Sequence, residues 1–266
     1  MAKSNNAPHQ FFAFTLFLLS WQSIKSVRGE GAEEIEYDYE QWSSKGPEHW
    51  GELKEEWKEC KNGDLQSPID LIDSNARRVI TAEDDLSHLT MSYKPSPATM
   101  KLEGHDISIE FTDDAGSIHI NGTDYFLKKC HWHRSSEHHI NGRSYDLELH
   151  MVHQSQDKNV AVVAFLYQTG EPDPFLSKIS DKVGTKEADL GVTDPSSITW
   201  PSSQFYRYIG SLTTPPCTGG VIWTVNNEVH TVSAEQLELI EEVDQGVNAR
   251  PLQPLNDRDV TLFGAQ

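Results

Sequence analysis

Apolar runs long enough to cross a membrane are missing from this 266-residue sequence. The longest, Phe11 to Trp21, is shorter than the roughly 20 residues that a membrane-spanning helix needs. It follows Lys3 and precedes small and polar residues up to Gly29, which is typical of a secretory signal peptide. We therefore expect residues 1–29 to be removed, with cleavage near Gly29, and no membrane insertion of the mature chain.

Basic residues are scarce: 22 lysines and arginines stand against 41 aspartates and glutamates, a net charge of −19 at pH 7. Loss of residues 1–29 would remove three basic and no acidic residues, which makes the net charge −22. Such an acidic surface argues against nucleic acid and anionic membranes as partners. Repeats, low-complexity tracts and interdomain linkers are also absent from the sequence, so we expect one domain.

Only three cysteines are present, which in an exported chain leaves room for one disulfide and one free thiol. Cys60 and Cys217 lie in polar, loop-like sequence. Cys130 alternates with histidines, so its side chain is expected on an apolar strand face. We predict the disulfide Cys60–Cys217. The one N-glycosylation sequon begins at Asn121, in an Asn-Gly turn that should be exposed.

Helical periodicity is scarce as well. Short alternating runs dominate from Thr90 onward, and Val160–Tyr167 is apolar almost throughout, which is typical of a central strand buried on both sides. Helices are predicted for residues 53–57 and for Ser233–Glu242, which begins with capping residues. We expect a sheet-dominated domain over residues 46–266 and an acidic leader over residues 30–45.

Half of the twelve histidines fall within residues 131–153. Residues i and i+2 of a strand share a face, so His131 and His133 point the same way, as do Glu148 and His150 in the next alternating segment. If the two segments pair antiparallel, three imidazoles converge and leave a fourth position open, as in catalytic zinc sites. A lone strand histidine is usually just a surface residue. The third histidine, with a carboxylate placed to hold a ligand's second N–H, favours a metal site.

The segment Ser211–Cys217, Ser-Leu-Thr-Thr-Pro-Pro-Cys, is the other unusual stretch. By itself it is a stiff Pro-Pro loop. Beside three histidines, the loop could instead orient a group bound to the metal. A hydroxyl that donates its hydrogen bond to a carboxylate has only its oxygen left as an acceptor, so it can bond only a partner that carries a proton, such as a metal-bound hydroxide. Thr213 paired with a buried Glu137 would do this.

Six motifs occur together and in order, beginning at Gln66, Gly104, Cys130, Ser136, Glu148 and Ser211: Gln-Ser-Pro-Ile-Asp, Gly-His-Asp, Cys-His-Trp-His, Ser-Glu-His, Glu-Leu-His-Met-Val-His and Ser-Leu-Thr-Thr-Pro-Pro-Cys. In this combination the chain resembles an α-class carbonic anhydrase, most like the secreted plant members, from about Gly46 to about Leu255. The resemblance implies a mainly β fold, a single domain with a large, mostly antiparallel twisted central sheet and a few short peripheral helices. It implies one zinc ion per chain and reversible hydration of carbon dioxide to bicarbonate and a proton by zinc-hydroxide attack.

The resemblance also implies a role for each matching residue. His105 would shuttle protons, since an imidazole titrates near pH 6.5, although as a bare sequence feature it is an ordinary surface histidine. The other implied roles are zinc ligation by His131, His133 and His150, hydroxide orientation by Thr213 with Glu137, ligand support by Glu148 and the carbonyl of Asn248, a substrate pocket of Val152, Val162, Leu212, Thr214 and Trp223, the disulfide Cys60–Cys217, and cis bonds at Ser67-Pro68 and Pro215-Pro216.

Several positions depart from the family pattern. Lys129 stands where a glutamine commonly assists one ligand, and a lysine cannot accept the N–H of that histidine. Its charge is expected to lower zinc affinity or the pKa of zinc-bound water. Arg134 replaces a smaller residue, and Glu103 and Ser108 replace asparagines of the proton path in animal relatives. Tyr39 is the best candidate for the amino-terminal tyrosine of the water network.

Two rival interpretations remain. His131, His133 and Glu137 satisfy the HxH…Glu spacing of a manganese-binding, germin-like cupin, but the second cupin motif is missing. A storage or binding protein, as the tuber dioscorins largely are, could retain this scaffold without catalysis. The presence of all three ligand histidines favours the enzyme. We expect an extracellular or apoplastic protein, with delivery to the chloroplast by the secretory route as the alternative, and a monomer, with a dimer as the alternative.

The residues at positions 103 and 108 predict slower proton transfer than in the fastest relatives. Stopped-flow hydration of carbon dioxide at several buffer concentrations would measure this step. A buffer-independent turnover equal to that of the fastest relatives would contradict the prediction.

Overall fold

The structure is a computed structural model that describes residues 36–79, 89–104, 106–198, 204–244 and 246–264, with the side chains of Glu103 and Asp244 left undescribed. The described residues belong to one compact unit. The predicted signal peptide, the first part of the predicted leader and His105 lie outside the described residues. No helix in the described ranges is long and apolar enough to span a membrane.

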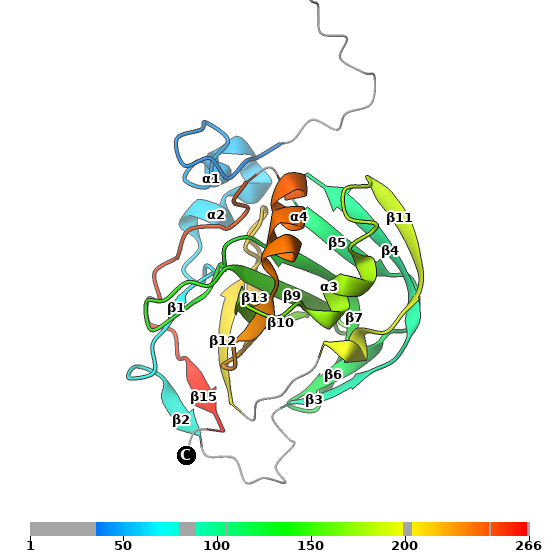
Figure 1. The fold of residues 1–266 in the computed structure, drawn as a ribbon. Helices are drawn as coiled ribbons and strands as arrows, with labels where there is room; N and C mark the ends of the chain where they lie inside the picture. The colour runs from blue at the N-terminus through cyan, green and yellow to red at the C-terminus, as the bar shows by residue number, and fades with distance from the viewer. Residues whose placement is uncertain (1–35, 80–88, 105, 199–203, 245, 265–266) are drawn as a thin grey trace, which may run out of the picture. The chain divides into compact units, whose positions relative to one another are not determined.

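One large sheet of thirteen strands dominates the fold (Figure 1). Its strands are β2 Arg77–Val79, β3 Thr90–Tyr93, β4 Ser96–Glu103, β5 Asp106–Phe111, β6 Gly116–Ile120, β7 Thr123–His133, β9 Leu147–Gln154, β10 Val160–Thr169, β11 Glu187–Thr193, β12 Phe205–Ser211, β13 Gly219–Asn226, β14 His230–Val232 and β15 Thr261–Phe263. Two further strands, β1 Asp70–Leu71 and β8 His139–Ile140, pair in parallel as a small second sheet.

The order of the large sheet is β11-β4-β5-β7-β9-β10-β13-β12-β15-β2, with β14 beside β10 and β6 between β3 and β7. Neighbours are parallel only at β10–β13, β10–β14 and β15–β2 among the described strands, and antiparallel elsewhere. The predicted mainly β fold with a mostly antiparallel sheet is confirmed.

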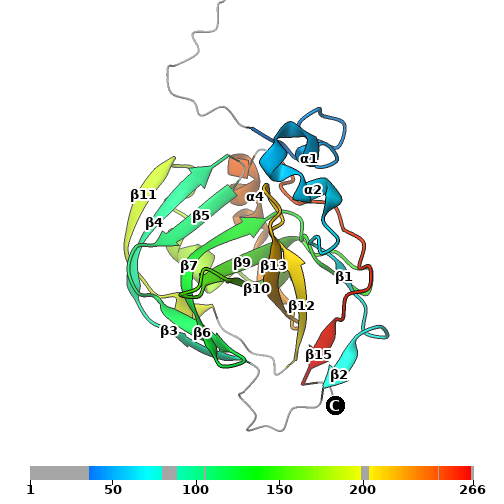
Figure 2. The ribbon, with the colours of Figure 1, turned by 180° about the vertical axis from the view of Figure 1, so that it is seen from behind.

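Alternation along β9 divides its side chains between the two faces of the sheet. Leu147, Leu149 and Met151 enter one core, which also takes residues from α3 (Pro174–Ile179) and α4 (Ala234–Asp244). These two helices cover that face, as the front and back views show (Figures 1 and 2). Glu148 and His150 point to the opposite face. The neighbouring strand β10 is buried from Ala161 to Tyr167, as predicted for a central strand.

The helices follow the sequence in part. Ser233 and Gln236 form a capping box before α4, because the Ser233 Oγ accepts from the Gln236 N–H at 3.2 Å and the Gln236 Oε1 accepts from the Ser233 N–H at 3.1 Å. The predicted helix over residues 53–57 is wrong. α1 (Trp50–Leu53) ends where Lys54 is extended (φ −145°, ψ 146°), a 3-10 turn spans Glu55–Trp57, and α2 covers Glu59–Asn62.

A cluster of aromatic rings and a disulfide explains this break. Trp50 and Trp57 are both buried beside the Cys60–Cys217 disulfide, and Tyr37 and Tyr39 pack against them. The Trp50 indole N–H is shared by the carbonyls of Asp38 and Lys45, each at 3.0 Å. Residues 37–45 of the predicted leader therefore contact the rest of the unit.

The cysteine predictions are confirmed, since Cys60 and Cys217 form a disulfide and Cys130 is buried and free. Ser67-Pro68 and Pro215-Pro216 are cis, as the resemblance implied. Asn121 lies in the turn between β6 and β7 with its side chain exposed, as expected for that turn.

His153 at the end of β9 is fully buried and neutral. Its Nδ1–H donates to the Ala161 carbonyl at 3.3 Å, and its Nε2 accepts from the Tyr93 hydroxyl at 2.8 Å. Burial lowers the pKa of His153 from 6.5 to about 3. At pH values between about 3 and 6.5, His153 is protonated in the unfolded chain and neutral in the folded chain. Stability is therefore lost as the pH falls from 6.5 towards 3.

Replacing His153 by glutamine should weaken this acid sensitivity. One pKa unit corresponds to about 1.4 kcal/mol, so the imidazole contributes about 2 kcal/mol to the loss of unfolding free energy between about pH 7 and pH 5. Urea unfolding of both proteins at the two pH values measures the difference. An equal loss in wild type and His153→Gln would show that another group is responsible.

Candidate metal centre

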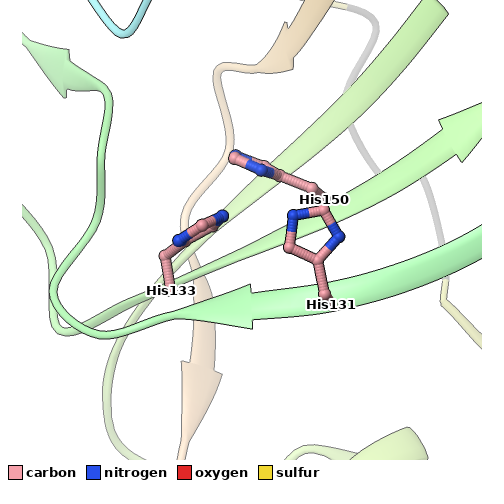
Figure 3. A group of neighbouring side chains, drawn as sticks. All are labelled: His131, His133 and His150. Carbon is pink, nitrogen blue, oxygen red and sulfur yellow. The ribbon is translucent and has the colours of Figure 1, made fainter. Parts of the chain in front are cut away.

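Three imidazoles meet on the face of the sheet opposite α3 and α4. His131 and His133 come from β7 and His150 from β9, and the antiparallel register places His131 directly opposite His150. The ring centroids are 4.9 Å (131–133), 5.1 Å (131–150) and 4.6 Å (133–150) apart. One nitrogen from each ring lies within 4.8 Å of the others. Figure 3 shows the rings turned toward a common point.

Two of the three rings are held by a hydrogen bond on the side away from this point. The His133 Nδ1–H donates to the Asn248 main-chain carbonyl at 2.8 Å, and the His150 Nε2–H donates to the Glu148 Oε1 at 2.7 Å. A nitrogen that donates carries the ring's proton, so His133 Nε2 and His150 Nδ1 are left as lone-pair donors facing the cluster. Glu148 and Asn248 thus lie where the sequence analysis placed them.

Burial and the neighbouring charges favour the neutral, metal-binding form of two of these imidazoles. Burial, and then the neighbouring His133 and His150, lower the pKa of His131 well below 6.5. Burial also lowers the pKa of His150, although Glu148 opposes it. For His133 burial lowers the pKa, but the carboxylates of Glu137 and Asp106 outweigh it and the net shift is upward. Metal binding requires the neutral ring, so a cation competes with a proton mainly at His133.

Glu137 lies beside the cluster. Its Oε1 accepts from the Arg250 main-chain N–H at 2.9 Å, while its buried Oε2 has no hydrogen-bond partner and lies 3.5 Å from His133 Nε2. Thr213 is buried in the loop after β12, but among the described residues no hydrogen bond joins it to Glu137. The loop is anchored by the disulfide at Cys217 and by the Gln66 side-chain amide, which donates to the Cys217 carbonyl at 3.1 Å.

An apolar row flanks the imidazoles on the β10 side. Val152 of β9 is opposite Val162 of β10, and Val162 is opposite Trp223 of β13, so the three side chains follow one another across the same face. The Trp223 ring centroid is 4.8 Å from that of His150, and its indole N–H donates to the Ser211 carbonyl at 3.0 Å. Leu212 packs against this row, and Thr214 follows in the same loop.

The donor set fits zinc. Three imidazole nitrogens converge, no cysteine of the described residues joins the group, and His133 Nε2 is a buried nitrogen without a hydrogen-bond partner. Three histidines with an open fourth position form the ligand set of catalytic zinc in carbonic anhydrases. This interpretation agrees with the sequence comparisons. A sequence model of the eukaryotic-type carbonic anhydrases matches residues 45–263.

The chain belongs to the α-class carbonic anhydrase family. Alpha carbonic anhydrase 4 of Arabidopsis thaliana is 45% identical over 259 residues, which cover 95% of each chain. A crystal structure of dioscorin complexed with ascorbate superposes with a TM-score of 0.82 at 41% identity, covering 86% of this chain and 98% of dioscorin. The α-carbonic anhydrase of Thermovibrio ammonificans with the inhibitor sulfanilamide gives 0.79 at 34% identity, covering 86% and 100%.

In this α-carbonic anhydrase chain, the sequence analysis missed a buried network behind Glu148. Glu148 Oε1 also accepts from His138 Nδ1 at 2.6 Å, and Oε2 accepts from the His138 main-chain N–H at 2.7 Å. The His138 Nε2 in turn bonds the Tyr208 hydroxyl at 2.7 Å, which bonds Ser67 Oγ at 2.8 Å. His138 and His150 outweigh the burial of Glu148 and hold its pKa well below 4.5. No local sequence signal links residues so far apart.

Two predicted features of the carbonic anhydrase proton path are not described. His105 lies outside the described residues, and the side chain of Glu103 is not described. Tyr39 lies in the aromatic cluster, and the charge of Asp106 contributes to raising its pKa after burial itself. The same two causes raise the pKa of Tyr37, a residue that the sequence analysis did not consider.

Replacing Glu148 by glutamine should weaken zinc binding by this carbonic anhydrase. Three N–H groups donate to the carboxylate, and an amide would turn its NH2 toward at least one of them. We expect zinc dissociation to be faster by about 10–100-fold and the unfolding free energy to fall by about 1–3 kcal/mol. Transfer of zinc to a chelator and urea unfolding measure the two effects. The exposed Glu238→Gln is the matched control, and wild-type zinc retention by Glu148→Gln would contradict the prediction.

Proposed function

We propose that this chain is a zinc enzyme that catalyses the reversible hydration of carbon dioxide to bicarbonate and a proton, with one zinc ion per chain. The observation that carries the proposal is the convergence of three buried imidazoles from two paired strands beside an apolar row. Membership of the α-carbonic anhydrase family supports the same reaction.

His131, His133 and His150 would hold zinc through the nitrogens that face the cluster. Bound to three neutral imidazoles, zinc supplies an undiminished positive charge, which in carbonic anhydrases lowers the pKa of a coordinated water to about 7. The outer hydrogen bonds to Glu148 and Asn248 orient two of the ligands, so that little reorganisation accompanies binding.

The substrate would lie against the apolar row. Carbon dioxide has no hydrogen-bond donor, and the side chains of Val152, Val162 and Trp223 would offer it an apolar surface beside His150. Leu212 and Thr214 extend this surface along the loop after β12. Bicarbonate carries a charge, which water solvates better than apolar side chains do, so its release to solvent would be favoured.

Thr213 would orient the attacking oxygen. Glu137 is held by the Arg250 main-chain N–H, and its buried Oε2 has no hydrogen-bond partner and is therefore open to a donor. A Thr213 hydroxyl that donates to this oxygen has only its lone pairs left for the reacting group, which fixes the direction of the group's own proton. His105 would then carry the released proton to buffer.

We also propose that the protein passes through the secretory pathway to the extracellular space or apoplast, with the chloroplast as the alternative destination. The Cys60–Cys217 disulfide and the exposed Asn121 sequon support an oxidising, glycosylating route. Residues 1–29 would act as the signal peptide, residues 30–45 as a leader and residues 46–266 as the catalytic domain. The acidic composition supports a monomer that binds neither nucleic acid nor membrane.

Replacing His131 by alanine should abolish both zinc binding and activity, because two imidazoles do not complete the ligand set. Zinc quantification and stopped-flow hydration of carbon dioxide on purified protein measure both. His119→Ala, which removes a half-buried histidine of β6 that bonds Asp124, is the matched control and should behave like wild type. Wild-type protein without zinc or activity would favour the alternative of a binding or storage role.

A further inference from the structure

Two buried polar atoms without hydrogen-bond partners belong to directly opposed residues beside the metal centre. The Nδ1 of His131 and the Oγ of Ser108 are both inaccessible to solvent and neither has a hydrogen-bond partner. Ser108 is fully buried, and His131 is 8% exposed. The register of β5 and β7 places these two residues directly opposite each other.

The partnerless nitrogen of His131 is the one on the outer side of the ring. In Figure 3 one ring nitrogen of His131 faces the other two imidazoles, and the nitrogen next to the Cβ-bearing carbon, Nδ1, faces away. When the inner nitrogen gives its lone pair to a metal, the outer nitrogen carries the proton and needs an acceptor. His133 and His150 have such acceptors in Asn248 and Glu148.

Among the described side chains of β5, that of Ser108 is the acceptor directly opposite His131. Lys129 precedes His131 by two residues on the same strand face, but an ammonium group only donates. Glu110 is opposite Lys129 and accepts from Lys101 at 2.5 Å. Asp106, two residues before Ser108, accepts from Asn248 at 3.2 Å. Directly opposed residues have Cβ atoms about 4.5–5.5 Å apart, a separation that the Ser108 hydroxyl can span by rotation about χ1.

We propose that the Ser108 Oγ accepts the His131 Nδ1–H in the zinc-loaded protein and thereby holds this ligand in its binding orientation. Ser108 is then a positioning residue that acts through His131 and does not touch the substrate. One hydrogen bond gives a partner to two buried groups that otherwise have none. The inference rests on the proposed zinc binding and adds the third outer partner to the ligand set.

The first test is zinc retention by Ser108→Ala, measured as the rate of zinc transfer from the purified holoprotein to a chelator. Loss of an outer partner typically lowers metal affinity about 10–100-fold, and we expect dissociation to accelerate at least about tenfold. Ser96→Ala is the matched control, because Ser96 on β4 is also buried and, among the described residues, its hydroxyl donates to the Pro97 carbonyl at 3.4 Å. If Ser108→Ala loses zinc at the same rate as the wild-type protein, the proposal is overturned.

The second test separates positioning from packing. Lys129→Gln introduces a side-chain carbonyl on the same face as His131, which can accept the Nδ1–H in place of Ser108. In the Lys129→Gln background, Ser108→Ala should no longer accelerate zinc loss. An equal acceleration in both backgrounds would show that Ser108 acts by packing and would overturn the proposal. Wild-type protein that binds no added zinc would overturn the proposed function itself, and with it this inference.

Discussion

The pairing of β7 with β9 is the constraint on which the rest of the site depends. Side chains alternate with a period of two, so a shift of one residue would turn His131 and His133 into the core beneath α3 and α4 and bring Cys130 and Trp132 to the other face. The register is held by that core, in which Trp132, Leu149 and Met151 are almost completely buried. The apolar residues between the ligands therefore determine where the ligands point.

Hydrogen bonds connect Glu148, on the metal-site face of the sheet, to the loop that follows β12. A buried carboxylate is costly unless it is paired and hydrogen-bonded, and Glu148 accepts from two imidazoles and one main-chain N–H. Through His138 and Tyr208 the network reaches Ser67, whose Oγ accepts from the Ser211 N–H at 3.1 Å. Ser211 directly precedes the loop of Thr213. The orientation of one proposed zinc ligand and the position of that loop therefore share one chain of buried hydrogen bonds.

The sequence predicts what depends on local periodicity and misses what depends on contacts between distant segments. Alternation was enough to place His150 and Leu149 on opposite faces of the sheet. Together with the count of three cysteines, it was also enough to predict that Cys130 is buried and free. The break at Lys54 was not predictable, because it arises from the burial of Trp50 and Trp57 in one cluster. The hydrogen bonds from His138 to Glu148 were missed for the same reason. α3 is different: Asp173, which caps it through the Leu176 N–H at 2.7 Å, precedes a proline, and this pair was an available helix-start signal.

Strand order also divides the site into an apolar and a polar half. On one side of the histidines, β10 and β13 carry Val162 and Trp223 next to the apolar end of β9. On the other side, β5 presents Asp106, Ser108 and Glu110 at alternate positions of the same face. Carbon dioxide requires an apolar wall, whereas a departing proton requires polar groups. His105 lies between β4 and β5 in the sequence. Since the histidines stand between the two halves, substrate and proton would use opposite sides of the site, and the order of strands in the sheet determines which side serves each.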